Sequence, residues 1–336
     1  MLALGGTRPT LIERSTGERD VVCGGFLGWD ALAALERLGV DASALGARPI
    51  RRLRLVASTK VVEAKLPKAA AGLSRRRLDT VLLARAAEAG TELLRGRAVR
   101  AVDPEALTVR LEDDEELSGD ALFLATGKHE LRGFPREVGA ILPAVGLRTA
   151  VQASAGLTAQ LDGFIELHLF DGGYAGLLLQ EDGSANLCLS VSKARLAGAG
   201  GVGALIAELA REAPLLGRRL AEAPSDWEAI AGVPYGWRAR ETVPGLFRIG
   251  DQGAVIASLA GDGVAIALTS GIAAAEALLA GRSASDYQHS FAAQSRRPLA
   301  IAGALRRAAE SPRLRGSLMR LAPALAPLAA RLTRIG

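Results

Sequence analysis

The stretch Leu246–Gly271 constrains the fold of this chain more than any other part of it. It reads LFRIGDQGAVIASLAGDGVAIALTSG: a short apolar run, then Gly250-Asp251, a loop, Gly261-Asp262-Gly263 and an Ala-rich run. We interpret this order as a strand that ends at an acid, a glycine loop and the amino end of a helix. Such an order suits a chain that wraps a polyol and a polar heterocycle.

Length and composition indicate a globular protein. The chain has 336 residues, of which 49% are hydrophobic and 23% charged, so it can bury a sizeable core as one large domain or two intimate ones. No apolar run approaches the roughly 18 residues of a membrane span. The start MLALGGTRPT does not resemble a signal peptide, and the two cysteines, Cys23 and Cys188, argue against a disulfide scaffold. We therefore expect a cytoplasmic protein.

The net charge of +5 is concentrated near the C-terminus, where nine arginines accompany a single acid, Glu310. These are Arg296, Arg297, Arg306, Arg307, Arg313, Arg315, Arg320, Arg331 and Arg334. Leu and Ala alternate with them at helical spacing. Two interpretations follow: a solvated face of helices that pack on the body, or a surface that adheres to an anionic membrane. Aromatic residues make up only 4%, so we expect no nucleic-acid partner. The histidines are scattered, so we expect no metal site.

The pattern of apolar residues predicts an α/β fold with an antiparallel sheet inserted into it. In the first half we expect a strand within Thr7–Arg14, a strand pair near 52–66, a helix that Ser74 caps, a hairpin from Glu92 to Leu111 and a buried strand at Asp120–Thr126. We expect antiparallel strands from Gly146 onward and a helix at Val264–Ala280. A helical tail broken by Pro298, Pro312, Pro323 and Pro327 should follow. GAGGVG at 198–203 matches a nucleotide-loop pattern, but no strand-end acid follows it, so we interpret it as a flexible loop.

Several short motifs in this order resemble a known family. They are TLIER ending at Glu13 and Arg14, VCGGFL at 22–27, Ser74-Arg75, Ala125-Thr126-Gly127 and the Gly250-Asp251 block. The chain is similar to FAD-dependent oxidoreductases of the p-hydroxybenzoate hydroxylase and geranylgeranyl reductase type. The resemblance implies a three-layer Rossmann-like FAD domain (1–145 and 241–282), an inserted antiparallel substrate domain (146–240) and C-terminal helices (283–336).

The resemblance also implies roles for particular residues. An acid that ends the second strand of a dinucleotide fold accepts hydrogen bonds from ribose, which makes Glu13 a candidate ligand or, alternatively, a surface acid. Asp251 would bind the ribityl chain, and Cys23 would face the substrate unless it is only a small buried residue. The other implied FAD contacts are Arg75, Val99, Ala125, Thr126, Gly127, Gly250, Gly261, Asp262 and Gly263. The helix after Gly263 would direct its amino end at the flavin ring.

Two departures from the family pattern affect the expected function. The glycine-rich strand and loop of this family normally lie about 20 residues before the acid, but only twelve residues precede Glu13, so we expect a truncated chain. KHELR at 128–132 replaces the turn that serves nicotinamide binding in the hydroxylases, although NADPH remains a candidate electron donor. The sequence thus predicts an FAD-dependent monooxygenase acting on an apolar or aromatic small molecule. The alternatives are a flavin-dependent reductase of isoprenoid double bonds and a non-catalytic, truncated remnant that no longer binds FAD tightly.

Overall fold

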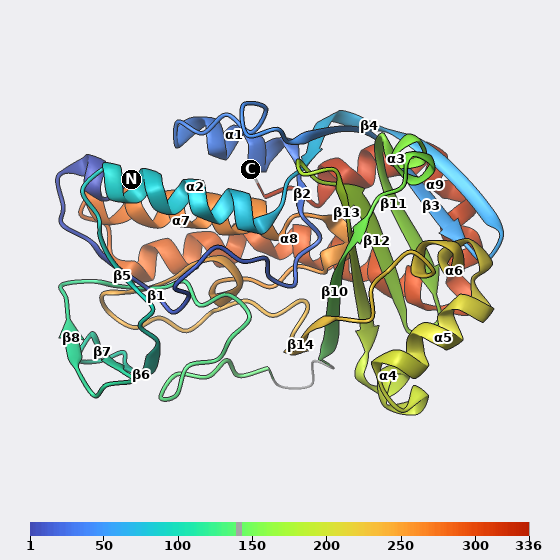
Figure 1. The fold of residues 1–336 in the computed structure, drawn as a ribbon. Helices are drawn as coiled ribbons and strands as arrows, with labels where there is room; N and C mark the ends of the chain where they lie inside the picture. Colours follow the sequence, from blue (N-terminus) through green and yellow to red (C-terminus); the bar gives the residue numbers. More distant parts are fainter. Residues whose placement is uncertain (139–142, 336) are drawn as a thin grey trace.

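A computed structural model describes residues 1–138 and 143–335 of the chain. The molecule is built around one large sheet, with helices on both of its faces, and a second lobe of helices and short strands beside it (Figure 1). The predicted α/β class, with an inserted sheet and a helical C-terminus, is confirmed. The boundaries that we assign to the domains stay a prediction.

The large sheet has eight strands drawn from both halves of the chain. Their order is β14 (Glu228–Val233), β10 (Ala144–Gln152), β13 (Ser184–Ser192), β12 (Gly173–Leu179), β11 (Gly163–Phe170), β3 (Arg48–Ala57), β4 (Lys60–Gly72) and β2 (Phe26–Leu27). Neighbours pair antiparallel except β11 and β3, which pair parallel. The hairpin turns at Gly172 and Gly183 have positive φ angles of 74° and 82°, which glycine adopts without strain. The predicted insert is therefore not purely antiparallel, because β3 and β11 meet from separate parts of the chain.

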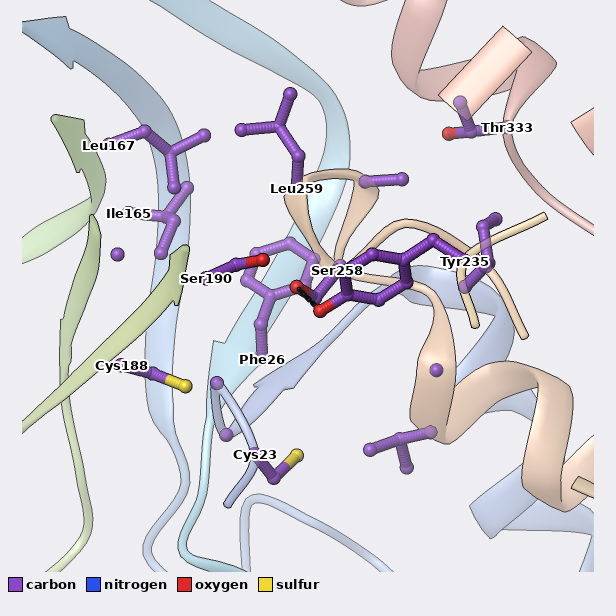
Figure 2. A pocket seen from close by; sticks show the side chains of 18 of the residues that line it. Cys23, Phe26, Ile165, Leu167, Cys188, Ser190, Tyr235, Ser258, Leu259 and Thr333 are labelled. Carbon is purple, nitrogen blue, oxygen red and sulfur yellow. Dashed lines mark hydrogen bonds between the residues drawn. The ribbon is translucent and has the colours of Figure 1, made fainter. Parts of the chain in front are cut away.

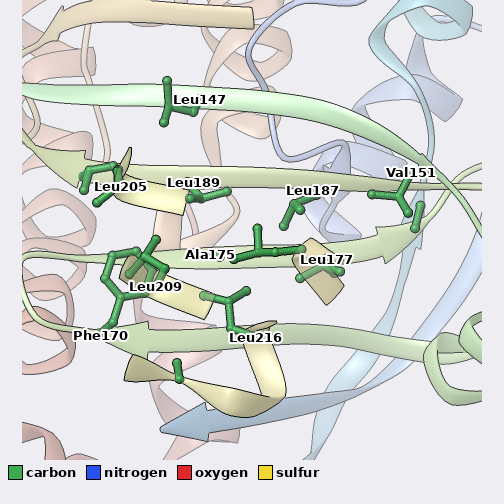
Figure 3. Close-up of a cluster of buried hydrophobic side chains, with 14 of the residues drawn as sticks. Leu147, Val151, Phe170, Ala175, Leu177, Leu187, Leu189, Leu205, Leu209 and Leu216 are labelled. Carbon is green, nitrogen blue, oxygen red and sulfur yellow. The ribbon is translucent and has the colours of Figure 1, made fainter. Parts of the chain in front are cut away.

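One face of the sheet is covered by short helices. Alternate residues of the strands, including Leu177, Leu187 and Leu189, pack against Leu205 and Leu209 of the covering helices (Figure 3). All five are buried, and burial of one leucine side chain contributes about 2 kcal/mol. The helices of this layer are α3 (Ala155–Leu161), α4 (Lys193–Ala199), α5 (Val202–Glu212) and α6 (Pro214–Leu220).

On each strand, the residues that alternate with these buried leucines point to the opposite face of the sheet. This face packs through Leu55, Leu169 and Tyr174 against Met319 and Ala322. The covering helices are α8 (Ala284–Glu310) and α9 (Pro312–Leu332), and both continue through their prolines. The predicted breaks at Pro298, Pro323 and Pro327 are wrong, because tertiary packing holds the helices across the lost hydrogen bonds. Pro312 instead begins α9.

The second lobe contains two separate pairs of parallel strands. In the first pair β1 (Thr10–Glu13) runs beside β5 (Glu92–Arg95), and in the second β9 (Leu122–Leu124) runs beside β15 (Leu246–Arg248). Among the described residues no strand ladder joins the two pairs. A third, antiparallel sheet consists of β6 (Val99–Asp103), β7 (Thr108–Leu111) and β8 (Glu116–Ser118).

This arrangement corrects two local predictions. The segment from Glu92 to Leu111 is not one hairpin, because β5 pairs with β1 and only β6 pairs with β7. The acidic residues 112–116 lie at and beyond the turn between β7 and β8. The glycine-rich run at 198–203 is not a loop either, since it ends α4 at Gly200 and enters α5.

The helices of the second lobe are α1 (Trp29–Arg37), α2 (Arg75–Glu88) and α7 (Gly263–Leu279), with 3₁₀ turns η1 (Ala3–Gly5), η2 (Gly250–Gln252) and η3 (Ser258–Ala260). Ser74 caps α2 as predicted, because its Oγ accepts a hydrogen bond from the Arg77 amide at 3.1 Å. Among residues 1–138 and 143–335, no helix combines the length and hydropathy needed to cross a membrane.

Candidate functional site

A large cavity lies between the helix-covered sheet and the second lobe. Its volume is about 660 Å³, within the range of small-molecule sites. Ile165, Leu167, Cys188 and Ser190 of the sheet point into it, and residues of the loop around Ser258 face them (Figure 2). The alternation of the strands explains this wall: Cys188 and Ser190 lie between the leucines that pack on the other face.

Most of the predicted site residues line this cavity. They come from four separate parts of the chain and are Cys23, Arg75, Ala125, Gly127, Gly250, Asp251, Gly261 and Gly263. The β9 and β15 strands bring Ala125, Gly127 and Gly250-Asp251 together because they pair in parallel and end at the same edge. Two motifs more than 120 residues apart in the sequence therefore share one wall.

Three glycines of the cavity wall present open backbone. A Cβ atom built on Gly24, Gly127 or Gly263 would meet no heavy atom within 4 Å. All three line the cavity, so a ligand can approach their main chain closely. Gly127 also has a φ of 62°, a conformation that favours glycine.

The amino end of α7 reaches this wall at Gly263 and Val264. The first amides of a helix have no acceptor within the helix and carry its positive dipole end, so they favour a negatively polarised ligand group. Asp262, which precedes them, is fully buried and contacts the Arg334 guanidinium. That guanidinium also lies 4.4 Å from the centre of the Trp29 ring. Asp262 therefore holds the end of the chain against α1 and α7 rather than lining the cavity.

Lys128 forms an ion pair with Asp251, the residue predicted to bind the ribityl chain. Lys128 Nζ lies 3.1 Å from Asp251 Oδ2, and the side chains are 25% and 17% exposed. The Asp251 charge raises the pKa of Lys128 above its ordinary value, so the amine stays protonated. Sequence reasoning singled out Asp251 but not Lys128, although its position directly after Gly127 at the end of a strand was an available signal.

Arg75 begins α2 and makes a two-pronged ion pair with Asp79. Its Nε and Nη2 atoms lie 2.9 Å and 2.8 Å from the two carboxylate oxygens. Both side chains line the cavity, as does Cys23. Cys188 lies on the sheet wall, where burial raises the pKa of its thiol to about 12.

A hydroxyl cluster links the sheet wall of the cavity to the loop that faces it. Tyr235 Oη lies 2.8 Å from Ser258 Oγ, and Tyr174 Oη also hydrogen-bonds to Ser258. Burial raises the pKa of Tyr174 well above its ordinary value, so its phenol stays protonated. None of these three residues is among the predicted site residues. Tyr174, Tyr235 and Ser258 lie on separate segments, so no local motif brings them together.

Three predicted residues have roles elsewhere and, like Asp262, do not line the described cavity. Glu13 ends β1, and its carboxylate accepts a hydrogen bond from the Ser15 amide at 2.7 Å. Val99 belongs to β6 and packs against a buried cluster that includes Val102 and Leu124. Thr126 donates a hydrogen bond to the His129 carbonyl at 3.0 Å and stabilises the loop after β9. No group of His, Cys, Asp and Glu with metal-binding geometry occurs among the described residues.

Comparisons with protein-family models and with curated proteins found no match for this chain. Solved structures do match it. The flavin-dependent brominase Bmp2 is 16% identical with a TM-score of 0.77, and the match covers 99% of this chain and 88% of Bmp2. The oxygenase of 2-methyl-3-hydroxypyridine-5-carboxylic acid is 18% identical with a TM-score of 0.70, covering 99% and 92%. PqsL of Pseudomonas aeruginosa, described as a probable FAD-dependent monooxygenase, is 18% identical with a TM-score of 0.68, covering 94% of each chain.

This chain therefore has the fold of FAD-dependent monooxygenases and flavin-dependent halogenases. The resemblance inferred from the order of the short motifs is confirmed at the level of the fold. Because one fold supports several chemistries, the reaction has to be argued from the site.

Proposed function

We propose that this protein is an FAD-dependent oxidoreductase, and within that class a monooxygenase that acts on an apolar or aromatic small molecule. The observation that carries the proposal is the convergence of Asp251, Gly127 and Gly263 on one cavity. Gly127 comes from a segment far from the stretch Leu246–Gly271 that contains Asp251 and Gly263, and the local motifs of both segments indicate cofactor contacts.

The residues of the cavity fit a flavin. Open backbone at Gly24, Gly127 and Gly263 suits a flat ring system, since a side chain there would occupy the space. The Asp251 carboxylate can accept hydrogen bonds from a polyol chain, and Lys128 beside it can neutralise a phosphate. Bound FAD would supply the two-electron redox chemistry that side chains lack.

The protein groups would act by position and charge. The amino end of α7 would stabilise negative charge on the ring edge that it faces. The sheet wall, with Leu167 and Leu169, would hold an apolar substrate and exclude water. Tyr235 and Ser258 would orient a polar group of that substrate by hydrogen bonding.

Two alternatives make different predictions. A reductase of isoprenoid double bonds would use the same apolar wall, and VCGGFL at 22–27 resembles the Cys-Gly-Gly segment of the geranylgeranyl reductases. A non-catalytic remnant would keep the fold without holding FAD tightly.

The test is reconstitution of the purified protein with FAD, followed by NADPH oxidation with and without oxygen. The proposal predicts a visible flavin spectrum that remains after gel filtration, and substrate-stimulated NADPH oxidation that requires oxygen. Oxidation that proceeds equally without oxygen when an isoprenoid is present would identify the reductase. A protein that emerges free of flavin would support the remnant.

A further inference from the structure

The C-terminal helix α9 leaves a row of leucines in solvent. Leu314, Leu321, Leu325 and Leu328 are 47–54% exposed, and only three other large apolar side chains of the described residues are exposed. Successive members are seven, four and three positions apart, so they lie along one side of the helix. We call these four residues the leucine stripe. Exposed apolar rows of this kind mark surfaces that contact another phase or molecule.

A row of arginines runs beside the leucine stripe. Arg313, Arg320 and Arg331 are exposed and are spaced seven and eleven positions apart, which places them roughly a quarter turn around the helix from the leucines. None of the three forms an ion pair with a described residue, while Arg315 pairs with Asp171. The segment 312–332 contains no acid. The exposed side of α9 is therefore both apolar and uniformly cationic.

The packing of α9 on the body does not account for the leucine stripe. The helix uses a different side for that contact, where Met319 and Ala322 are 4% and 5% exposed and pack near Leu55 and Leu169. The leucine stripe is therefore not part of the surface that fixes the helix to the sheet. Its exposure to water costs free energy that no contact among the described residues of the fold offsets.

The leucine stripe is continuous with the cavity of the candidate site. Leu321, Leu325 and Leu328 line the cavity and are also about half exposed, so they form part of its mouth. Thr333, just after the helix, is drawn at the edge of the same cavity in Figure 2. An apolar molecule that reaches α9 therefore has an apolar route to the interior.

We propose that α9 docks this protein on an anionic lipid surface, with the leucine stripe in the headgroup and acyl boundary and the mouth of the cavity toward the lipid. Helices with an apolar side and a flanking cationic row bind such surfaces in this orientation. The uncompensated arginines favour anionic lipid over a neutral surface or another copy of this basic chain. Docking does not depend on flavin binding, so it can be tested independently of the proposed function.

The first experiment is co-sedimentation of the full chain with vesicles of equal parts phosphatidylglycerol and phosphatidylcholine, compared with pure phosphatidylcholine. We expect binding to the anionic vesicles that weakens as salt rises, since exposed charges are screened. The double variant Leu321→Gln/Leu325→Gln and the double variant Arg320→Gln/Arg331→Gln should each lower the partition by about tenfold.

The matched control is Leu4→Gln/Leu279→Gln, which removes two leucines that are 73% and 41% exposed outside α9. It should bind within about twofold of the wild type. Circular dichroism and melting temperature verify that each variant is folded. Equal binding to both vesicle types, no binding, or an unchanged Leu321→Gln/Leu325→Gln variant overturns the proposal.

A second readout locates the leucine stripe. Tryptophan in place of Leu328 should be quenched by brominated acyl chains in anionic vesicles, whereas Leu4→Trp should not. The reverse order of quenching overturns the orientation. Light scattering without lipid tests the rival occupant: a dimer that Leu321→Gln/Leu325→Gln abolishes would assign the leucine stripe to a second copy and overturn the lipid surface.

Discussion

At the scale of single residues, the cavity wall sets the chemistry of its thiols. Cys188 is only partly exposed and lies between buried leucines of β13. Burial raises the pKa of its thiol to about 12, because the thiolate loses more solvation than the thiol. Cys188 therefore acts as a small neutral wall residue at neutral pH, and Cys23 on the facing wall remains the better candidate for contact with substrate.

This assignment predicts slow alkylation of Cys188. Only the thiolate reacts with iodoacetamide, so the rate at Cys188 should stay low at pH 8 and rise steeply only as the pH approaches about 12. Peptide mass spectrometry separates modification of the two cysteines, with Cys188→Ser as the control for site identity. Modification of Cys188 at pH 8 as fast as that of an exposed free thiol contradicts the assignment.

At the scale of secondary-structure elements, a capping residue fixes where the helix that carries Arg75 begins. Ser74 is fully buried, caps α2 and also hydrogen-bonds through its amide to Glu181 at 2.9 Å. Ser74→Ala should lower the free energy of unfolding by about 1–2 kcal/mol, measured by urea denaturation. Ser317→Ala, at an exposed position inside α9, should change it by less than about 0.5 kcal/mol. Equal effects of the two substitutions would refute a capping role.

The secondary-structure elements also show which features of the fold and the site can be predicted from the sequence. The cap at Ser74 and the turn at Gly250-Asp251 depend on neighbours in the chain, and both were found in the sequence. The ion pair of Lys128 with Asp251 joins distant segments, so no local pattern contains it. Pro298 shows the opposite error, since it is a strong local signal that packing of α8 overrides. Local chemistry thus predicts elements and motifs, and tertiary contacts decide the rest of the site.

At the scale of the whole molecule, Glu166 joins the sheet to its helical cover. Its buried carboxylate lies 2.9 Å from Arg54 of β3, 2.9 Å from Arg219 of α6 and 2.8 Å from His168. Burial acts to raise the pKa of Glu166, but the hydrogen bonds from His168, Arg219 and Arg54 outweigh it and lower that pKa below the ordinary value. The network therefore stabilises the fold at neutral pH.

The lowered pKa of Glu166 makes the free energy of unfolding depend on pH. Because its pKa is lower in the folded than in the unfolded state, its contribution is present above the ordinary glutamate pKa of about 4.3 and is lost as the pH falls through the folded value. Glu166→Gln should lower the free energy of unfolding at pH 7 by about 3 kcal/mol and flatten the acid limb. Glu116→Gln, in the exposed pair with Arg110, is the control and should have little effect. An acid limb that is identical in Glu166→Gln and wild type would exclude this role.

An FAD titration of matched leucine variants shows whether the cavity at Gly263 holds a flavin. Gly263 and Gly203 both lie in the first turn of a helix with open space before them, but only Gly263 lines the cavity. Wild type and Gly203→Leu should bind FAD with the same affinity, measured by quenching of its fluorescence. Gly263→Leu should bind at least about tenfold more weakly, a loss of about 1.4 kcal/mol. Equal affinity of all three proteins, or no binding by any of them, would contradict a flavin site in this cavity.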